Sequence, residues 1–289
     1  MTDETASIAL SIVIPTKNEA AAIGEVVSVA RSKYAEAEII VVDDGSDDTT
    51  AEVAEAAGAI VISHPESLGN GAAVKSGARA ANGEILALMD GDGQHDPGEL
   101  DRLLEKLEQG YDMAVGARHS GSQANVGRLF ANGLYNELAS LISGRRIPDL
   151  TSGFRVVRTS LFRKFLYLLP NGFSYPTTIT MAFLRSGFPV CFEPVEVADR
   201  SGKSHIRPIR DGVRFLVIIF KIATLYSPLK VFLPISAAFF ATGLSYYAYT
   251  YFTSGRLTNM SVLVFSAAVI VFLIGLISEQ ITALTYSKS

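Results

Sequence analysis

Two long uncharged stretches near the C-terminus restrict the fold of this chain more than any other feature. Residues 231–255 contain no charged side chain, residues 257–278 contain none either, and only Arg256 separates them. A helix needs about 20 apolar residues to cross a bilayer, and both stretches reach that length. We therefore predict two transmembrane helices, at about residues 231–253 and 258–280, joined by a tight turn. Core helices of a soluble protein are the alternative.

Basic residues gather just before the first uncharged stretch and are rare beyond it. The turn carries Arg256, and the C-terminal tail carries Lys288. Because positively charged segments stay on the cytoplasmic side, we expect an integral membrane protein whose N-terminal part and both termini are cytoplasmic. No signal peptide is expected, since Asp3 and Glu4 replace its basic start. The basic residues before the first stretch are Lys203, Arg207, Arg210, Arg214, Lys221 and Lys230.

An amphipathic helix is predicted at residues 207–229, between a cytoplasmic domain at residues 1–206 and the transmembrane part at residues 230–289. Its basic residues recur at helical spacing beside a mainly apolar surface, which is typical of a helix in the membrane interface. An earlier segment, residues 126–142, forms either a second interface helix or a core helix. Its apolar face consists of Phe130, Leu134, Leu138 and Leu141.

Apolar stretches and helical periodicity alternate along the cytoplasmic part. Strands are predicted at residues 7–15, 38–43, 59–63 and 84–89, and helices at residues 19–32, 48–57 and 71–81. This succession predicts an α/β fold with a mostly parallel sheet and helices on both faces. Ligands of such sheets bind beyond the carboxyl ends of the strands. The net charge of −4 argues against a nucleic-acid binder, and the single Cys191 excludes an internal disulfide.

Two carboxylates and an amide follow the last of these strands. Asp90, Asp92 and Gln94 occupy alternate positions, which share one face in an extended chain. Such oxygen ligands suit Mg²⁺ or Mn²⁺, with water or phosphate oxygens completing the coordination. An EF-hand is excluded because its sixth and twelfth positions lack the required Gly and Glu. A polar loop without a metal is the structural alternative.

Polar residues at a second strand end predict a nucleotide site. We expect Asp43 and Asp44 to contact the base and ribose of a nucleotide, whereas Ser46 or Asp47 has an alternative role as a helix N-cap.

Small residues at positions 68–77 open a helix. They would let a nucleotide approach the backbone at Gly69, with Lys75 as a phosphate partner. The P-loop spacing is broken, and an ordinary helix-start turn explains the segment equally well.

Four segments, taken together, resemble the GT-A glycosyltransferases of family 2. They are residues 15–19 (Pro-Thr-Lys-Asn-Glu), 41–46 (Val-Val-Asp-Asp-Gly-Ser), 89–95 (Met-Asp-Gly-Asp-Gly-Gln-His) and 149–155 (Asp-Leu-Thr-Ser-Gly-Phe-Arg). The polyprenyl- and dolichyl-phosphate glycosyltransferases, which include the dolichol-phosphate mannose synthases, are the most similar group. The likeness extends from Ser11 to about Arg207.

The resemblance implies a metal-dependent, inverting transfer of a hexose from GDP-mannose or a UDP-hexose to the phosphate of a membrane polyprenol, either undecaprenyl or dolichyl phosphate. It also implies a membrane homotetramer, and it makes Asp90, Asp92 and Gln94 the ligands of Mg²⁺ or Mn²⁺. The residues implied to contact the nucleotide-sugar are Pro15, Lys17, Glu19, Val42, Asp43, Asp44, Gly69, Lys75, Asp90, Gly91, Asp92 and Gln94.

The same resemblance implies a set of residues at the acceptor phosphate. Guanidinium groups suit this task because they bind phosphate oxygens bidentately. Asp92, Arg118 and Asp149 are the implied catalytic residues; Asp149 occupies the position of a proposed base, or else orients Arg118 or a sugar hydroxyl. Lys17, Asn132 and His205 replace residues usual in the family. The implied acceptor contacts are Arg118, Arg128, Asn132, Ser152, Arg200 and Lys203.

Two other functions are considered. A processive polysaccharide synthase would be expected to carry a Gln-x-x-Arg-Trp motif and more transmembrane spans, but the chain contains no Trp. A non-enzymatic membrane adaptor with a decayed transferase domain would be expected to lack the metal carboxylates, which are intact here.

Overall fold

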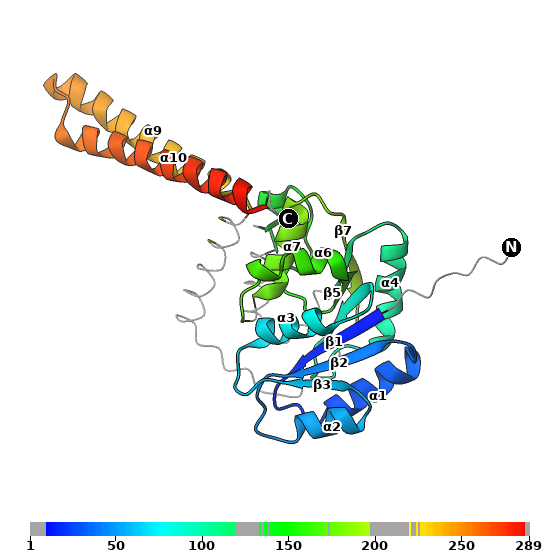
Figure 1. Ribbon diagram of the computed structural model, residues 1–289. Coiled ribbons are helices and arrows are strands. Elements are labelled where there is room, and N and C mark those ends of the chain that lie inside the picture. The colour runs from blue at the N-terminus through cyan, green and yellow to red at the C-terminus, as the bar shows by residue number, and fades with distance from the viewer. Residues whose placement is uncertain are drawn as a thin grey trace. The chain divides into compact units, whose positions relative to one another are not determined.

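The computed structural model describes residues 10–118, 133, 136–137, 139–172, 174–196, 220, 224 and 226–286 (Figure 1). The chain divides into two compact units. The first, called the N-terminal unit, comprises residues 1–140 and 145–208, and the second, the C-terminal unit, comprises residues 141–144 and 209–289.

A seven-stranded sheet forms the centre of the N-terminal unit as described. Its strand order is β3-β2-β1-β4-β6-β5-β7. The β6 strand is antiparallel to both of its neighbours, and the other pairs are parallel. The predicted mostly parallel sheet is therefore confirmed. The strands are β1 (Leu10–Thr16), β2 (Glu38–Asp43), β3 (Ile60–Ser63), β4 (Ile85–Leu88), β5 (Met113–Arg118), β6 (Arg155–Arg158) and β7 (Val190–Val195).

Helices cover both faces of this sheet because alternate residues of its strands are apolar on both sides. In β1, Ile12 and Ile14 belong to the core formed with α1 and α4. Val13 points to the opposite face, where a Cβ on Gly77 of α3 would lie 2.3 Å from Val13 Cγ1. The helices are α1 (Ile23–Lys33), α2 (Thr50–Ala56), α3 (Asn70–Ala80), α4 (Leu100–Glu108), α6 (Thr159–Lys164) and α7 (Tyr175–Arg185), with short 3-10 helices at Pro97–Glu99 and Leu166–Leu168.

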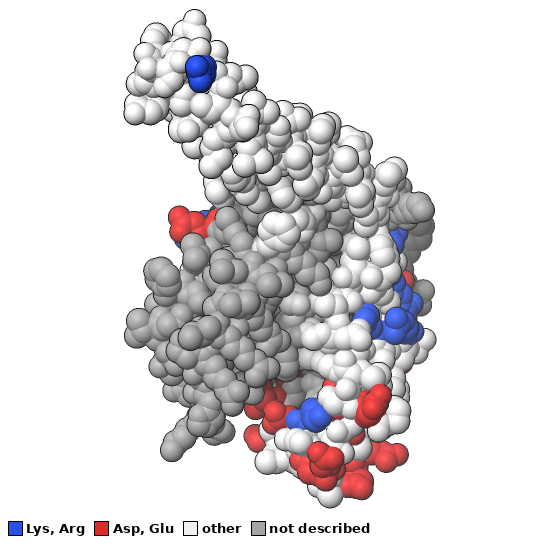
Figure 2. Space-filling view, turned by 90° about the vertical axis from the view of Figure 1, so that its left-hand side faces the viewer, with Lys and Arg blue, Asp and Glu red and all other residues white. Residues whose placement is uncertain are grey.

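The C-terminal unit contains a hairpin of two long helices, α9 (Pro228–Ser254) and α10 (Asn259–Tyr286). Gly255 ends α9 in a left-handed conformation with φ 64°, and its N–H donates to Tyr251 O. Both helices are long and apolar enough to cross a membrane, and only 11% and 17% of their most apolar windows are buried. Core helices of a soluble domain would be largely buried, so that alternative is not supported. The visible side of the hairpin carries very few charged side chains (Figure 2).

Small residues at seven-residue intervals pack the two helices together. Such a repeat keeps one side of each helix facing its partner, and small side chains allow close approach. Ser236 Oγ donates to Ala268 O at 2.8 Å, and a Cβ on Gly275 would lie 2.6 Å from Phe232 Cβ. The buried repeat consists of Ser236, Gly243 and Thr250 in α9 and Ser261, Ala268, Gly275 and Thr282 in α10.

The two predicted interface helices lie largely outside the described residues. Of residues 207–229, the structure describes positions 220, 224 and 226–229. In the segment at residues 126–142, the described positions are helical; Leu141 is 76% exposed and Ile142 is 4% exposed. Leu141 is therefore not a core residue.

Candidate functional site

Hydrogen bonds tie the loops after β1 and β2 together. Asn18 N donates to Ser46 Oγ, and Asp47 N donates to Asn18 Oδ1, each at 2.9 Å. Glu19 N donates to Thr50 Oγ1 at 2.9 Å. Asn18 has φ 55°, a left-handed conformation that Asn adopts more readily than most residues. The loop that carries Lys17 and Glu19 is thus fixed at the carboxyl edge of the sheet.

The N-terminus of α2 does not have the N-cap that was predicted as an alternative. Neither Ser46 nor Asp47 caps α2. Instead, Asp48 Oδ1 accepts a hydrogen bond from Thr50 N at 3.0 Å, while Ser46 donates through both its N and its Oγ to Asp43 Oδ1. The capping role predicted for Ser46 or Asp47 is wrong, because their polar groups join the two strand-end loops.

Asp43 and Asp44 have different environments. Asp44 accepts hydrogen bonds from His64 Nδ1, Ser67 Oγ, Leu68 N and Gly69 N at 2.8–2.9 Å. Burial alone would raise the pKa of Asp44, but these hydrogen bonds lower it. Asp44 therefore clamps the loop after β3. Asp43 Oδ2 accepts no hydrogen bond from the described residues, which makes Asp43 the better candidate for a nucleotide contact.

Two of the predicted nucleotide residues have other structural partners. Lys75 Nζ donates to Leu169 O and Asn171 Oδ1. A Cβ on Gly69 would lie 2.5 Å from Asn171 O, and one on Gly71 would lie 2.1 Å from Pro170 O. Residues 170–172 pack against the start of α3, so only glycine fits at positions 69 and 71. These contacts favour the alternative of an ordinary helix-start turn, and the nucleotide contacts of Gly69 and Lys75 stay a prediction.

The strand-end residues Pro15 and Val42 are buried in the sheet. The side chain of Val42 faces α3, since a Cβ on Gly77 would lie 3.2 Å from Val42 Cγ2. The contact of Val42 with a nucleotide-sugar stays a prediction.

Asp90 and Asp92 lie in a turn after β4, not in an extended strand. Gly93 has φ 73°, and Gln94 N donates to Asp92 Oδ1 at 3.1 Å. The prediction that alternate positions of a strand bring Asp90, Asp92 and Gln94 together is wrong in its geometry. Gly91 is buried beside β1, where a Cβ would lie 3.1 Å from Thr16 Oγ1. The turn thus places its two half-buried carboxylates at the carboxyl edge of the sheet.

The residues of this turn suit a divalent cation that is coordinated partly by the protein and partly by a substrate. No group of three His, Cys, Asp or Glu suited to a metal occurs among the described residues. Asp90, Asp92 and Gln94 would supply hard oxygen ligands, and phosphate oxygens and water would supply the rest. Thr16 Oγ1, His95 Nδ1 and Ser152 Oγ are buried without a hydrogen-bond partner among the described residues. Such atoms are rare in native proteins and suit a polar ligand.

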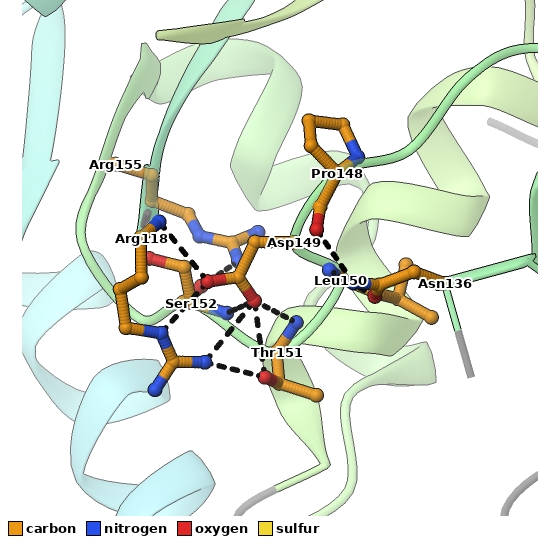
Figure 3. A network of polar contacts seen from close by, with 8 residues as sticks. All are labelled: Arg118, Asn136, Pro148, Asp149, Leu150, Thr151, Ser152 and Arg155. Atoms are coloured by element: carbon orange, nitrogen blue, oxygen red, sulfur yellow. Dashed lines mark hydrogen bonds and ion pairs between the residues drawn. The ribbon is translucent and has the colours of Figure 1, made fainter. Parts of the chain in front are cut away.

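Arg118, at the end of β5, forms a bidentate ion pair with Asp149 (Figure 3). Arg118 Nε donates to Asp149 Oδ2 at 2.7 Å, and Nη2 donates to Asp149 Oδ1 at 3.1 Å and to Thr151 Oγ1 at 2.6 Å. Arg118 Nη1 makes no hydrogen bond to the described residues. The side chain is 29% exposed. Arg118 can therefore present Nη1 to an anion while Asp149 holds its orientation.

The hydrogen bonds of Asp149 disfavour a role as a base. Besides the Arg118 donors, Thr151 N and Ser152 N donate to its Oδ1 at 3.0 and 3.1 Å. Burial alone would raise the pKa of Asp149, but the hydrogen bonds and charge of Arg118 lower it. The ionised carboxylate is saturated with donors, which favours the predicted alternative that Asp149 orients Arg118.

His95 and Arg155 belong to the same site, although no role was predicted for either. His95 stacks on Phe154 with ring centroids 4.6 Å apart and is 7% exposed. Burial lowers the pKa of His95 to about 4, so the imidazole is neutral at neutral pH. Arg155 is fully buried. Both residues lie in segments that resemble the family, but the sequence does not show that their side chains are buried, and burial is the property that sets them apart.

The buried His95 predicts a pH-dependent stability. Its pKa is about 4 when folded and 6.5 when exposed, so the unfolded chain binds a proton first as the pH falls. Stability is therefore full above pH 6.5 and falls by up to about 3 kcal/mol as the pH approaches 4. Thermal unfolding of the full chain in detergent with EDTA measures this. His95→Phe should flatten the decline between these limits; an unchanged slope in this variant would contradict the prediction.

The remaining predicted acceptor residues are only partly described. Ser152 is 2% exposed, and its Oγ has no hydrogen-bond partner among the described residues. Arg128, Asn132, Arg200 and Lys203 lie outside the described residues.

Comparison with protein families gives two matches that together cover most of the chain. The model of glycosyl transferase family 2 matches residues 11–166. The model of the GtrB C-terminal hairpin matches residues 227–284, which include α9 and α10.

Three relatives are similar to this chain over most of their own length. Glycosyltransferase AglJ of Haloferax volcanii is 30% identical over 96% of this chain and 94% of its own. The dolichyl-phosphate hexose transferase of the same organism is 31% identical over 70% of this chain and 89% of its own. The polyprenol monophosphomannose synthase of Mycolicibacterium smegmatis is 29% identical over 65% of this chain and 77% of its own.

A solved structure has a similar fold over three quarters of the chain. The glucosyl-3-phosphoglycerate synthase of Mycobacterium tuberculosis, in complex with Mn²⁺, UDP and phosphoglyceric acid, superposes with a TM-score of 0.60. Its sequence is 23% identical, and the match covers 75% of this chain and 78% of the other.

Proposed function

The chain belongs to glycosyl transferase family 2 and is a membrane-associated glycosyltransferase, and on this basis we propose that it transfers a hexose from a nucleotide-sugar to the phosphate of a membrane polyprenol. The observation that carries the proposal is the Arg118–Asp149 pair beside the Asp90–Asp92 turn. It combines an arginine oriented for a phosphate with carboxylates suited to a metal–diphosphate complex. The names of the polyprenyl- and dolichyl-phosphate relatives support the acceptor.

The proposed reaction needs little proton transfer because the acceptor phosphate is already an anion. A phosphate oxygen attacks the anomeric carbon, the bond to the nucleoside diphosphate breaks, and a single displacement inverts the configuration. Arg118 binds the acceptor phosphate, and Asp149 keeps the guanidinium oriented. When bound by Asp90, Asp92 and Gln94, Mg²⁺ or Mn²⁺ would neutralise the negative charge of the leaving diphosphate.

A membrane anchor on the same chain would keep such a site near a lipid acceptor. We propose that α9 and α10 anchor the enzyme in the membrane with the N-terminal unit and both termini in the cytoplasm, and that it forms a homotetramer. GDP-mannose and UDP-hexoses are both proposed donors. One relative is named a polyprenol monophosphomannose synthase, which supports mannose as the sugar, and a structural relative was crystallised with Mn²⁺ and UDP, which supports a UDP-linked donor.

Transfer of labelled sugar into an organic-extractable lipid tests this function. Purified full-length protein would receive a panel of GDP- and UDP-sugars, Mn²⁺ or Mg²⁺, and either undecaprenyl or dolichyl phosphate. Labelled lipid from at least one donor is expected. No labelled lipid from any donor, with folded protein that binds a nucleoside diphosphate, would contradict the proposed acceptor.

Asp149→Asn separates orientation from base catalysis. If Asp149 orients Arg118, the neutral amide should lower kcat/KM by roughly 10- to 100-fold, because one charge-assisted partner is lost. The shape of the pH–rate profile should remain that of the wild type. Disappearance of a rising limb in this variant, without a comparable change in Asp96→Asn, would instead identify Asp149 as the base.

A further inference from the structure

Arg155, the first residue of β6, is a fully buried guanidinium whose hydrogen-bond acceptors are all neutral. Nη1 donates to Pro176 O and Thr180 Oγ1, each at 3.2 Å, and Nη2 donates to Ser152 O. Nε has no hydrogen-bond partner among the described residues. The ion pairs formed by the described residues do not include Arg155.

A buried, unpaired guanidinium destabilises the folded protein. A buried charge without an ion-pair partner costs several kcal/mol unless other charges stabilise it. Burial lowers the pKa of Arg155, but a guanidinium stays protonated in proteins. The negative charges that stabilise it from longer range include Asp149 and Asp90. Both carboxylates belong to the candidate site, so the charge of Arg155 is coupled to the charges of that site.

Arg155 also holds the segment that borders both carboxylates. Its bond to Ser152 O fixes the turn between Asp149 and β6 (Figure 3). Within that turn, a Cβ on Gly153 would lie 3.2 Å from Asp90 Oδ2 and 3.3 Å from the hydroxyl of Tyr175. The guanidinium lies 6.0 Å from the Tyr175 ring. Arg155 therefore joins the turn, β6 and α7 around Asp90.

We propose that Arg155 is a positioning residue that supplies a fixed positive charge to the site and thereby strengthens binding of the donor diphosphate. The inference rests on the proposed function, which requires such a donor. Among the described residues, Asp90, Asp92 and Asp149 bring three carboxylates to the site, and Arg118 pairs with Asp149. A donor diphosphate adds further negative charge, and Arg155 offsets part of the repulsion through a medium of low dielectric constant.

Binding of UDP and GDP to the purified full chain, measured by calorimetry with Mn²⁺ present, tests this proposal. Arg155→Met should weaken binding of the preferred nucleotide by about tenfold or more, since each tenfold step is only about 1.4 kcal/mol. The loss should persist at high salt, because buried charges are screened much less than exposed ones. Thr180→Val, which removes one acceptor and keeps the charge, should bind within about threefold of the wild type.

Each outcome is decisive. Wild-type affinity in a folded Arg155→Met variant would overturn the proposal and leave Arg155 a structural residue. If that variant does not fold, Arg155→Lys replaces it: affinity retained despite a lower melting temperature supports the charge, and affinity lost in this folded variant overturns the proposal. A wild-type protein that binds neither UDP nor GDP would instead contradict the proposed function itself.

Discussion

Asp92→Asn is expected to lower kcat/KM for sugar transfer by about 1,000-fold, or roughly 4 kcal/mol of transition-state stabilisation. The amide keeps the shape of the side chain but removes the charge that would hold a divalent cation against the leaving diphosphate. Gln94 N donates to Asp92 Oδ1, and an amide oxygen can still accept this bond, so the turn should keep its conformation.

The control is Asp96→Asn, four residues further along. Asp96 is exposed, and its Oδ1 accepts from Gly98 N at 2.8 Å, a bond that an amide can also accept. This variant should retain nearly full activity. Calorimetric titration with Mn²⁺ and nucleotide should show weaker metal-dependent binding in Asp92→Asn alone. More than about one tenth of wild-type activity in Asp92→Asn would argue against metal ligation by this carboxylate.

Arg118→Met should raise the KM for polyprenyl phosphate and lower kcat/KM by about 100-fold, because Arg118 is proposed to bind the acceptor phosphate. Removing the guanidinium also leaves Asp149 buried without its cation, so stability should fall. Steady-state kinetics with polyprenyl phosphate as the varied substrate, at a temperature well below unfolding, measures the first effect separately from the second.

Arg102→Met is the matched control for Arg118. Arg102 forms ion pairs with Glu99 and Glu193 but is 46% exposed and lies on α4. Exposed ion pairs contribute little, so this variant should transfer sugar at the wild-type rate. An Arg118→Met enzyme whose KM for the lipid equals that of the wild type would refute the acceptor contact.

Periodicity predicted the strands and helices up to residue 89 well, because burial leaves a pattern in the sequence, but the elements from α4 to β7 were not predicted. The apolar strands β1, β2 and β4 pack helices on both faces, and their alternation with helices along the chain indicated a mostly parallel sheet. Helix boundaries were less accurate. The helix predicted from Glu19 begins at Ile23, because Ala22 N and Ile23 N first form a turn onto Glu19 O.

The sequence identified residues of the candidate site, but it did not predict how they are arranged in space. Asp90 and Asp92 were identified from an alternation that the structure replaces with a turn. Gly69 and Lys75 looked like a phosphate loop, yet they contact residues 169–172, which are about 100 positions away in sequence. The partnership of Arg118 with Asp149 spans 31 positions. Contacts over such distances depend on strand order, which periodicity does not provide.

The chemical nature of the lipid product tests the central proposal most directly. Mass spectrometry of the product from labelled donor and polyprenyl phosphate should show one hexose on a lipid with a single phosphate, with release of a nucleoside diphosphate. A lipid with two phosphates and release of a nucleoside monophosphate would mean that sugar phosphate is transferred. That result, or sugar found on a non-lipid acceptor alone, would contradict the proposed reaction.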